Sequence, residues 1–526
     1  MRAGIGRQTW WAALPLALVA VLVLIPVAMV VATGWGVDAI PVLTAPSTWR
    51  VVGYTAAQAL ISTTVSLALA LPAAYVLYRL RVPGRRTLLA ILTIPFILPT
   101  VVVGLAFREL LPFPGTTAAI VVAHVFFNVG LSVRVIGGLW GHLDPRLEQV
   151  GASLGLAPLT VFRRITWPLL APAVAAAGIL VLLFTFTSFG VVLVLGDPAL
   201  PTIEVDIYTR AMQRLDLSGA AVLALLQFVI VAAAIVVSSV LQDRLAVRQH
   251  LGDDLAIRRG PRSIADHTLV GYVIVLAVSI ALPLVSLLLR SLRVANGWGL
   301  TWYAEALAPS EGTTRTVSAV STLARSLEYA AAATLIAVIL GVLATVGILG
   351  ARRRGRWLDG VVMLPLGVSA VTVGLGLLLL SVRGPVDLRG WSLLVPVGQA
   401  LVALPIVVRV LLPVLRSTDP RLRQVAATLG AAPLRAWWAA EGGIALRATA
   451  VGAAFAAAVS LGEFGATAFL VRLETPTAPV QIVRLLGRPG EANIGVATAL
   501  AVMLLVLTVI IVSVAERIRP RRSGGW

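Results

Sequence analysis

The sequence predicts an all-α protein that crosses a membrane many times, and three observations support this fold class. Of its 526 residues, 59% are hydrophobic and only 12% are charged, and the mean hydropathy is +0.96. So few charged residues could not cover the surface of a soluble protein of this size. Apolar runs of about 20 residues, the length needed to cross a hydrocarbon core of about 30 Å, recur along the chain. We therefore expect a bundle of membrane-spanning helices.

Hydropathy predicts about twelve spans, six in each half of the chain. They are expected near 11–32, 53–78, 88–109, 118–139, 172–195, 219–241, 268–290, 326–349, 358–381, 391–413, 446–470 and 492–514. The first run is long for the apolar region of a cleaved signal, so we expect a retained span. Arginines follow spans two, four, six, eight and twelve. The positive-inside rule then predicts that both termini are cytoplasmic.

The two halves of the chain repeat each other in the same order. Asp144–Gly155 reads DPRLEQVGASLG, and 275 residues later Asp419–Gly430 reads DPRLRQVAATLG. Ile94–Leu105 parallels Leu364–Leu375. Because each half has an even number of spans, the repeats are parallel and are related by an axis along the membrane normal. The expected organisation is a first repeat over 1–245, a polar cytoplasmic linker over 246–267 and a second repeat over 268–526.

The composition excludes several kinds of chemistry. The chain has no cysteine, which excludes disulfides, thiolate metal sites and cysteine nucleophiles. All 42 basic residues are arginine, so the lysine of a nucleotide-binding P-loop is missing. No metal site is expected, since the four histidines have no ligand spacing. The net charge of +19 lies mainly in loops beside the spans, where arginine meets anionic lipid, and it does not indicate nucleic-acid binding.

Each copy of the repeated element is predicted to form two short helices joined by a turn. Asp144 and Asp419 are suitable N-caps with proline after them, and Gly155 and Gly430 are suitable left-handed stops. Between these ends lie two matching apolar stripes on helices too short to cross a bilayer, Leu147, Val150 and Leu154, and Leu422, Val425 and Leu429. A single stripe could pack on the chain's own helices. Two copies with the same stripe, cap and glycine favour a paired docking site for a two-fold partner.

The repeated element resembles the signature loop of the fused, double-length permeases of ATP-binding-cassette (ABC) importers with the type I fold. In that family the loop reads E-A-A, three residues, Gly, nine residues and then I-x-L-P. Here Gln149-Val150-Gly151 stands at the E-A-A position and is followed by Gly155, Ile165 and Trp167-Pro168. The second copy has Gln424-Val425-Ala426 and Gly430, but no I-x-L-P. Glutamine replaces the usual glutamate in both copies, although Glu148 is adjacent in the first.

Within this family, two segments are similar to the permeases for ferric iron and for thiamine. They are Phe186–Tyr208 and Ser460–Thr467, and the second is also similar to sulfate and molybdate permeases. The resemblance implies a transport subunit in the bacterial inner membrane, with no catalytic residues and no cofactor of its own. Two copies of a cytoplasmic ABC ATPase, which bind ATP and magnesium, would dock on the loops 144–167 and 419–441. An extracytoplasmic binding protein would deliver the solute, with ferric iron and thiamine as the first candidates.

Two other functions are weighed against this one. An ion-coupled secondary transporter of twelve spans would need a buried coupling site, for which Glu463 is the strongest candidate. Such a transporter would leave the repeated loop without a role. A membrane enzyme acting on lipid would need convergent polar groups at one interface, which the sequence does not indicate.

Two matching positions are candidates for lining the transport path. Ser188-Phe189 and Glu463-Phe464 lie toward the outer ends of spans five and eleven. A carboxylate inside a span costs about 2.5–3.5 kcal/mol on insertion scales, so Glu463 should face protein or a wet cavity. It could line or gate the path, or it could form a hydrogen bond between helices. Glu204 and Asp206, in the outward segment, could contact the delivering protein or simply be solvated.

Overall fold

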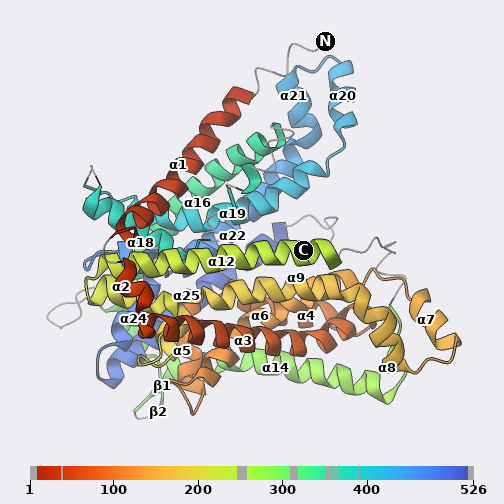
Figure 1. Cartoon of the computed structure of the whole chain (residues 1–526), viewed down its shortest axis with the longest axis horizontal. Helices are drawn as coiled ribbons and strands as arrows, with labels where there is room; N and C mark the ends of the chain where they lie inside the picture. The colour runs from red at the N-terminus through yellow and green to blue at the C-terminus, as the bar shows by residue number, and fades with distance from the viewer. Residues whose placement is uncertain are drawn as a thin grey trace.

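The computed structural model is almost entirely helical, which confirms the predicted fold class. It describes residues 9–36, 39–245, 258–295, 297–308, 318–350, 358–360, 362–363, 368–384, 387–388 and 390–518. Within these ranges the only sheet is a hairpin of two short strands, β1 (Arg293–Val294) and β2 (Gly297–Trp298). The long helices lie side by side in two groups, one around α3 and α6 and the other around α16 and α19 (Figure 1).

In the described part of the chain, nine helical segments are long and apolar enough to span a membrane. They are α3 (Pro46–Arg79), α6 (Thr117–Trp140), Pro158–Phe186 with α9 (Trp167–Phe186), α12 (Leu217–Leu245), α14 (Ile264–Leu292), α16 (Ala319–Gly350), α19 (Leu394–Arg416), Arg435–Gly462 with α22 (Gly443–Gly462), and α25 (Glu491–Ile518). The helix α1 (Thr9–Gly34) lies in the first predicted span. The helix α18 (Ala370–Arg383) has only 14 residues, and part of the predicted span 358–381 lies outside the described residues.

The predicted single span over 88–109 is wrong, because this segment is sharply bent. The helix α4 (Arg85–Thr93) continues into the short 3-10 turn η1 (Ile94–Ile97), and α5 (Thr100–Leu110) then leaves at 107°. Pro95 and Pro99 lie at the bend. Proline has no N–H to continue the helical hydrogen bonds, and its ring crowds the preceding turn, so the chain changes direction here.

The two halves have the same order of elements. The matching pairs are α3 and α16, α5 and α18, α6 and α19, α7 (Arg146–Ser153) and α20 (Pro420–Thr428), α9 and α22, α10 (Gly190–Leu195) and α23 (Thr467–Leu470), α11 (Ile203–Tyr208) and α24 (Ala478–Leu486), and α12 and α25. Single contacts are repeated as well. Thr55 Oγ1 accepts a hydrogen bond from the backbone N–H of Ile203 at 3.0 Å, and Ser326 Oγ accepts one from Ala478 at 2.7 Å. The 275-residue repeat is therefore structural, down to individual side chains.

The first long helix of each half packs on the other half. The helix α1 lies against α16 and α18, and α14 lies against α3, α4 and α5 (Figure 1). Gly376 of α18 allows a close approach, since an added Cβ would lie 2.5 Å from the carbonyl oxygen of Pro26 in α1. On the other side, Tyr272 donates to the carbonyl of Leu69 at 2.8 Å. The sequential halves are thus interlocked and do not form separate bundles.

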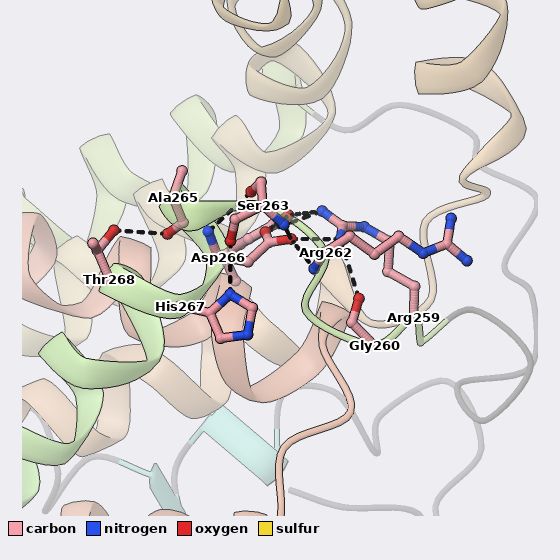
Figure 2. Close-up of polar contacts among 9 residues, drawn as sticks. Arg259, Gly260, Arg262, Ser263, Ala265, Asp266, His267 and Thr268 are labelled. Atoms are coloured by element: carbon pink, nitrogen blue, oxygen red, sulfur yellow. Dashed lines mark hydrogen bonds and ion pairs between the residues drawn. The ribbon is translucent and has the colours of Figure 1, made fainter.

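The end of the linker is fixed to the first half just before α14 begins. The backbone of Arg259 pairs with that of Leu80, at the end of α3. Its guanidinium donates to both carboxylate oxygens of Asp266, at 2.7 and 3.1 Å, and to the hydroxyl of Tyr75 at 2.8 Å. Asp266 also forms a capping box with Ser263, which starts α14 (Figure 2). This cluster holds the start of α14 against α3.

Cutting the chain between residues 246 and 257 should leave the two halves associated, because each keeps its first helix on the other half. We expect fragments 1–245 and 258–526, produced together with an affinity tag on only one, to co-purify in mild detergent. Removing residues 1–36 from the first fragment should weaken this association, since it removes α1. Separate elution of the complete fragments would contradict the interlocked packing.

Candidate functional site

The two repeated elements form short helices at the same end of the molecule. In Figure 1, α7 and α20 both lie at the right-hand ends of the long helices. The carboxylates of Asp144 and Asp419 each accept the backbone N–H of the residue two positions later, at 2.9 Å. Gly155 and Gly430 have φ of +80° and +84°, a conformation that glycine adopts without steric cost. The local structure is the one that the sequence predicts.

The apolar stripes of both short helices are exposed. The exposed fractions match position by position: Leu147 48%, Val150 57% and Leu154 75% in α7, and Leu422 51%, Val425 56% and Leu429 83% in α20. Gln149 and Gln424, at the glutamate position of the signature loop, are exposed beside them. The stripes therefore do not pack on the protein's own spans. The molecule presents two equivalent apolar faces at one end.

In the first half, α7 is held to the bundle by Glu148. The Glu148 carboxylate pairs with Arg79 of α3 at 2.5 Å and accepts a hydrogen bond from the Thr166 hydroxyl at 2.9 Å. Thr166 lies in the π-helical turn η2 (Phe162–Thr166) that leads into α9. Because Glu148 is directed inward, it does not replace the family glutamate on the exposed face.

In the second half, an ion pair of reversed polarity lies at the equivalent place. Arg423 of α20 pairs with Glu441 at 2.6 Å, and Glu441 is buried in the π-helical turn η5 (Trp438–Gly442) before α22. Counting 275 residues along, Arg423 corresponds to Glu148 and Glu441 to Thr166. Both short helices are thus tied to the base of the following span, but the acid and the base have changed sides.

The two phenylalanines predicted to line the path meet between the halves. The rings of Phe189 and Phe464 are stacked, with centroids 5.1 Å apart and an interplanar angle of 10°. Each lies in a break between helices, after α9 and after α22. Both are buried, whereas Ser188 is only half-buried. Two equivalent residues can touch in this way only near the pseudo-two-fold axis.

Glu463 is buried, but its hydrogen bonds are local. Its carboxylate accepts the backbone N–H groups of Ala466 at 2.8 Å and Thr467 at 3.0 Å, and also the Thr467 hydroxyl. These bonds satisfy free donors at the start of α23, as an N-cap does. Gln399 of α19 donates to the same threonine hydroxyl at 3.3 Å. Glu463 therefore stabilises the break between α22 and α23, next to the stacked rings.

The expectation that Glu204 and Asp206 could be solvated is wrong, because both are buried in α11. Glu204 has an exposed fraction of 0% and Asp206 of 6%. Asp206 is paired with Arg210 at 3.1 Å, whereas Glu204 accepts a hydrogen bond from Gln227 of α12. The alternation of these acids with Ile203, Val205 and Ile207 was the available signal, since such apolar residues indicate a buried segment.

Replacing Arg423 by glutamine should destabilise the second half, because it leaves the buried Glu441 carboxylate without its ion pair. We expect a loss of about 1–3 kcal/mol, the usual cost of a buried group deprived of its partner. Thermal unfolding of the purified protein measures it. Arg421→Gln, on the exposed surface of the same helix, is the matched control. Equal melting temperatures for the two variants would contradict a holding role for Arg423.

No family model matches the chain, but similar proteins extend over most of it. The thiamine transport system permease protein ThiP of Escherichia coli (strain K12) is 28% identical over 511 residues, 90% of this chain and 89% of that protein. ThiP of Brucella abortus (strain 2308) is 27% identical over 510 residues, 91% and 89% of the two chains. The probable sulfate transport system permease protein cysT of Helicosporidium sp. subsp. Simulium jonesii is 26% identical over 191 residues, 33% of this chain and 71% of that protein. The resemblance to double-length ABC permeases, which the repeated motifs indicate, is therefore confirmed over about nine tenths of the chain.

Proposed function

We propose that this chain is the membrane-spanning permease of an ABC importer and that α7 and α20 are its two docking helices. One observation carries the proposal: the same three aliphatic side chains are exposed on each of two equivalent helices at one end of the molecule. An exposed apolar face is costly in water and indicates a protein partner. Two equivalent faces fit two copies of one ATPase, which would lie in the cytoplasm.

The holding contacts of each short helix support a mechanical role. Glu148 connects α7 to both α3 and the turn before α9, and Arg423 connects α20 to the turn before α22. A displacement of either docking helix would therefore be transmitted to the base of a span. ATP-driven closure of the motor would bring α7 and α20 together, and the interlocked halves would rock between inward-open and outward-open arrangements.

The names of the relatives favour an organic solute. Those that extend over about 90% of this chain are permeases of thiamine transport systems, and the sulfate permease matches only 33% of it. We therefore place thiamine ahead of ferric iron as the solute, delivered by an extracytoplasmic binding protein. The permease itself would hydrolyse nothing, because ATP and magnesium would be bound by the partner.

Introducing aspartate at Leu147 or Leu422 should weaken the binding of the ATPase. Burying an aliphatic side chain contributes roughly 1.5–3 kcal/mol, so each substitution should lower the affinity about tenfold or more, and the double variant should not co-purify. The measurement is co-purification with the candidate ATPase, together with thiamine-dependent ATP hydrolysis in proteoliposomes.

Leu200→Asp is the matched control for this experiment, because Leu200 is 42% exposed and lies between α10 and α11, away from the docking helices. It should leave the complex intact. If the double variant bound the ATPase as tightly as the control, the docking assignment would be wrong. Thiamine accumulation by the chain alone, driven by an ion gradient without ATP, would instead support a secondary transporter.

The stacked Phe189 and Phe464 are the proposed closure of the path. They come from equivalent breaks in the two halves, so rocking of the halves would separate them. An aromatic pair contributes about 0.5–1.5 kcal/mol beyond its buried area, a strength that the energy of the motor can overcome. Ser188 and Glu463, which precede the two rings, belong to the same constriction.

Replacing both phenylalanines by alanine should make the path leak, because it removes the two rings that meet between the halves. We expect the efflux of radiolabelled thiamine from proteoliposomes without ATP to rise several-fold. Phe184→Ala is the control, since Phe184 is 40% exposed and pairs with Phe96. Efflux from the double variant at the rate of this control would refute the closure.

A further inference from the structure

Glu204 is a fully buried carboxylate that the transport mechanism above does not use. Its Oε1 accepts a hydrogen bond from Gln227, which is 2% exposed, and its Oε2 has no hydrogen bond of normal geometry. The amide oxygen of Gln227 is likewise without a partner. Among the described residues, no arginine or histidine forms an ion pair with Glu204. A buried acid without a counter-charge is costly, so its retention calls for a ligand.

The second half of the molecule helps to cover this carboxylate. The helices α11 and α12, which carry Glu204 and Gln227, both contact α18. The hydroxyl of Ser369, the N-cap of α18, interacts with the carboxylate, although Ser369 Oγ already accepts the backbone N–H of Thr372 at 3.0 Å. Relative motion of the two halves would therefore uncover Glu204 toward the path between them.

An aromatic cluster adjoins this carboxylate. Tyr208 lies four residues after Glu204, on the same face of α11. Its ring is 5.3 Å from that of Phe189 and 5.6 Å from that of Phe469, measured between centroids. Phe189 in turn stacks on Phe464. Both halves thus contribute aromatic rings beside one unpaired acid, a combination that recognises organic cations through charge and cation–π contacts.

The repeat shows that the fold does not require this acid. The residues 275 positions after Glu204 and Gln227 are Pro479 and Val502. The helices there, α24 and α25, pack in the same order as α11 and α12, and Ser326 anchors α24 as Thr55 anchors α11. An apolar pair therefore satisfies the packing of this site. The polar pair has been kept in one half only.

We propose that Glu204, supported by Gln227, is a binding site for the positively charged group of an organic cation passing between the two halves. The nearby cations are engaged elsewhere. Arg210 pairs with Asp206 and Asp216, and Arg484 donates to the carbonyl of Leu473 at 3.1 Å. The carboxylate would supply the counter-charge and the aromatic cluster a surface for a flat ring. The inference rests on the proposed transport function and assigns a solute site to it.

The test is the equilibrium binding of radiolabelled thiamine, a cationic heteroaromatic solute, to the purified full chain in lipid nanodiscs. Glu204→Gln keeps the size of the side chain and removes its charge, so the dissociation constant should rise at least about tenfold, as for other buried charge pairs that lose one partner. Glu204→Asp should restore part of the affinity. Asp216→Asn, a half-exposed carboxylate beyond the same helix, is the control and should bind like the unmodified chain.

A neutral analogue separates charge recognition from general damage to the site. Binding of thiochrome, the uncharged ring-closed oxidation product of thiamine, should be the same with and without Glu204→Gln. Equal losses for both ligands, or unchanged thiamine binding, would overturn the proposal. If Glu204→Gln does not fold, Gln227→Val, which copies the second half, should fold and weaken thiamine binding several-fold; unchanged binding would also overturn it.

The outcomes for the site and for the proposed function are distinct. If the unmodified chain binds the ATPase through α7 and α20 but does not bind thiamine, the cation site is wrong and the permease function stands. If thiamine binding depends on Glu204 but no ATPase docks, the site is supported and the importer function fails.

Discussion

The exchange of α1 and α14 between the halves is the contact on which the rest of the structure depends. In a membrane, apolar surface gains little by leaving lipid, so helices associate through close packing and a few polar contacts. The approach of Pro26 to Gly376 and the bond from Tyr272 to Leu69 are contacts of these two kinds. Since each half holds a helix of the other, the halves can rock but do not separate, as alternating access requires.

A nearly symmetric frame carries asymmetric chemistry. The helices, the bends and the N-terminal anchors of α11 and α24 are repeated, because they depend on shape and on backbone hydrogen bonds. The charged positions differ: the acid of the holding contact lies on the short helix in one half and on the span in the other. Both arrangements join the same two elements, so the mechanical connection persists while the polarity is free to change.

The contacts form a continuous route from one end of the molecule to the middle. The exposed stripes lie on α7 and α20, whose holding residues reach the turns before α9 and α22. Those two spans end at the breaks that carry Phe189 and Phe464. Movement at the docking faces is therefore connected, through two rigid helices, to the constriction between the halves.

The sequence by itself determined the membrane class, the parallel repeat and the form of the short helices, because these depend on local properties: apolar run length, caps and glycine stops. It placed Phe189 and Phe464 at matching positions, but their stacking needed the packed halves. Only the tertiary structure decided the exchange of α1 and α14, the sharp bend between α4 and α5, the inward direction of Glu148 and the burial of Glu204. Each of these depends on residues far apart in the chain or on the direction taken after a proline, and neither is encoded in hydropathy or spacing.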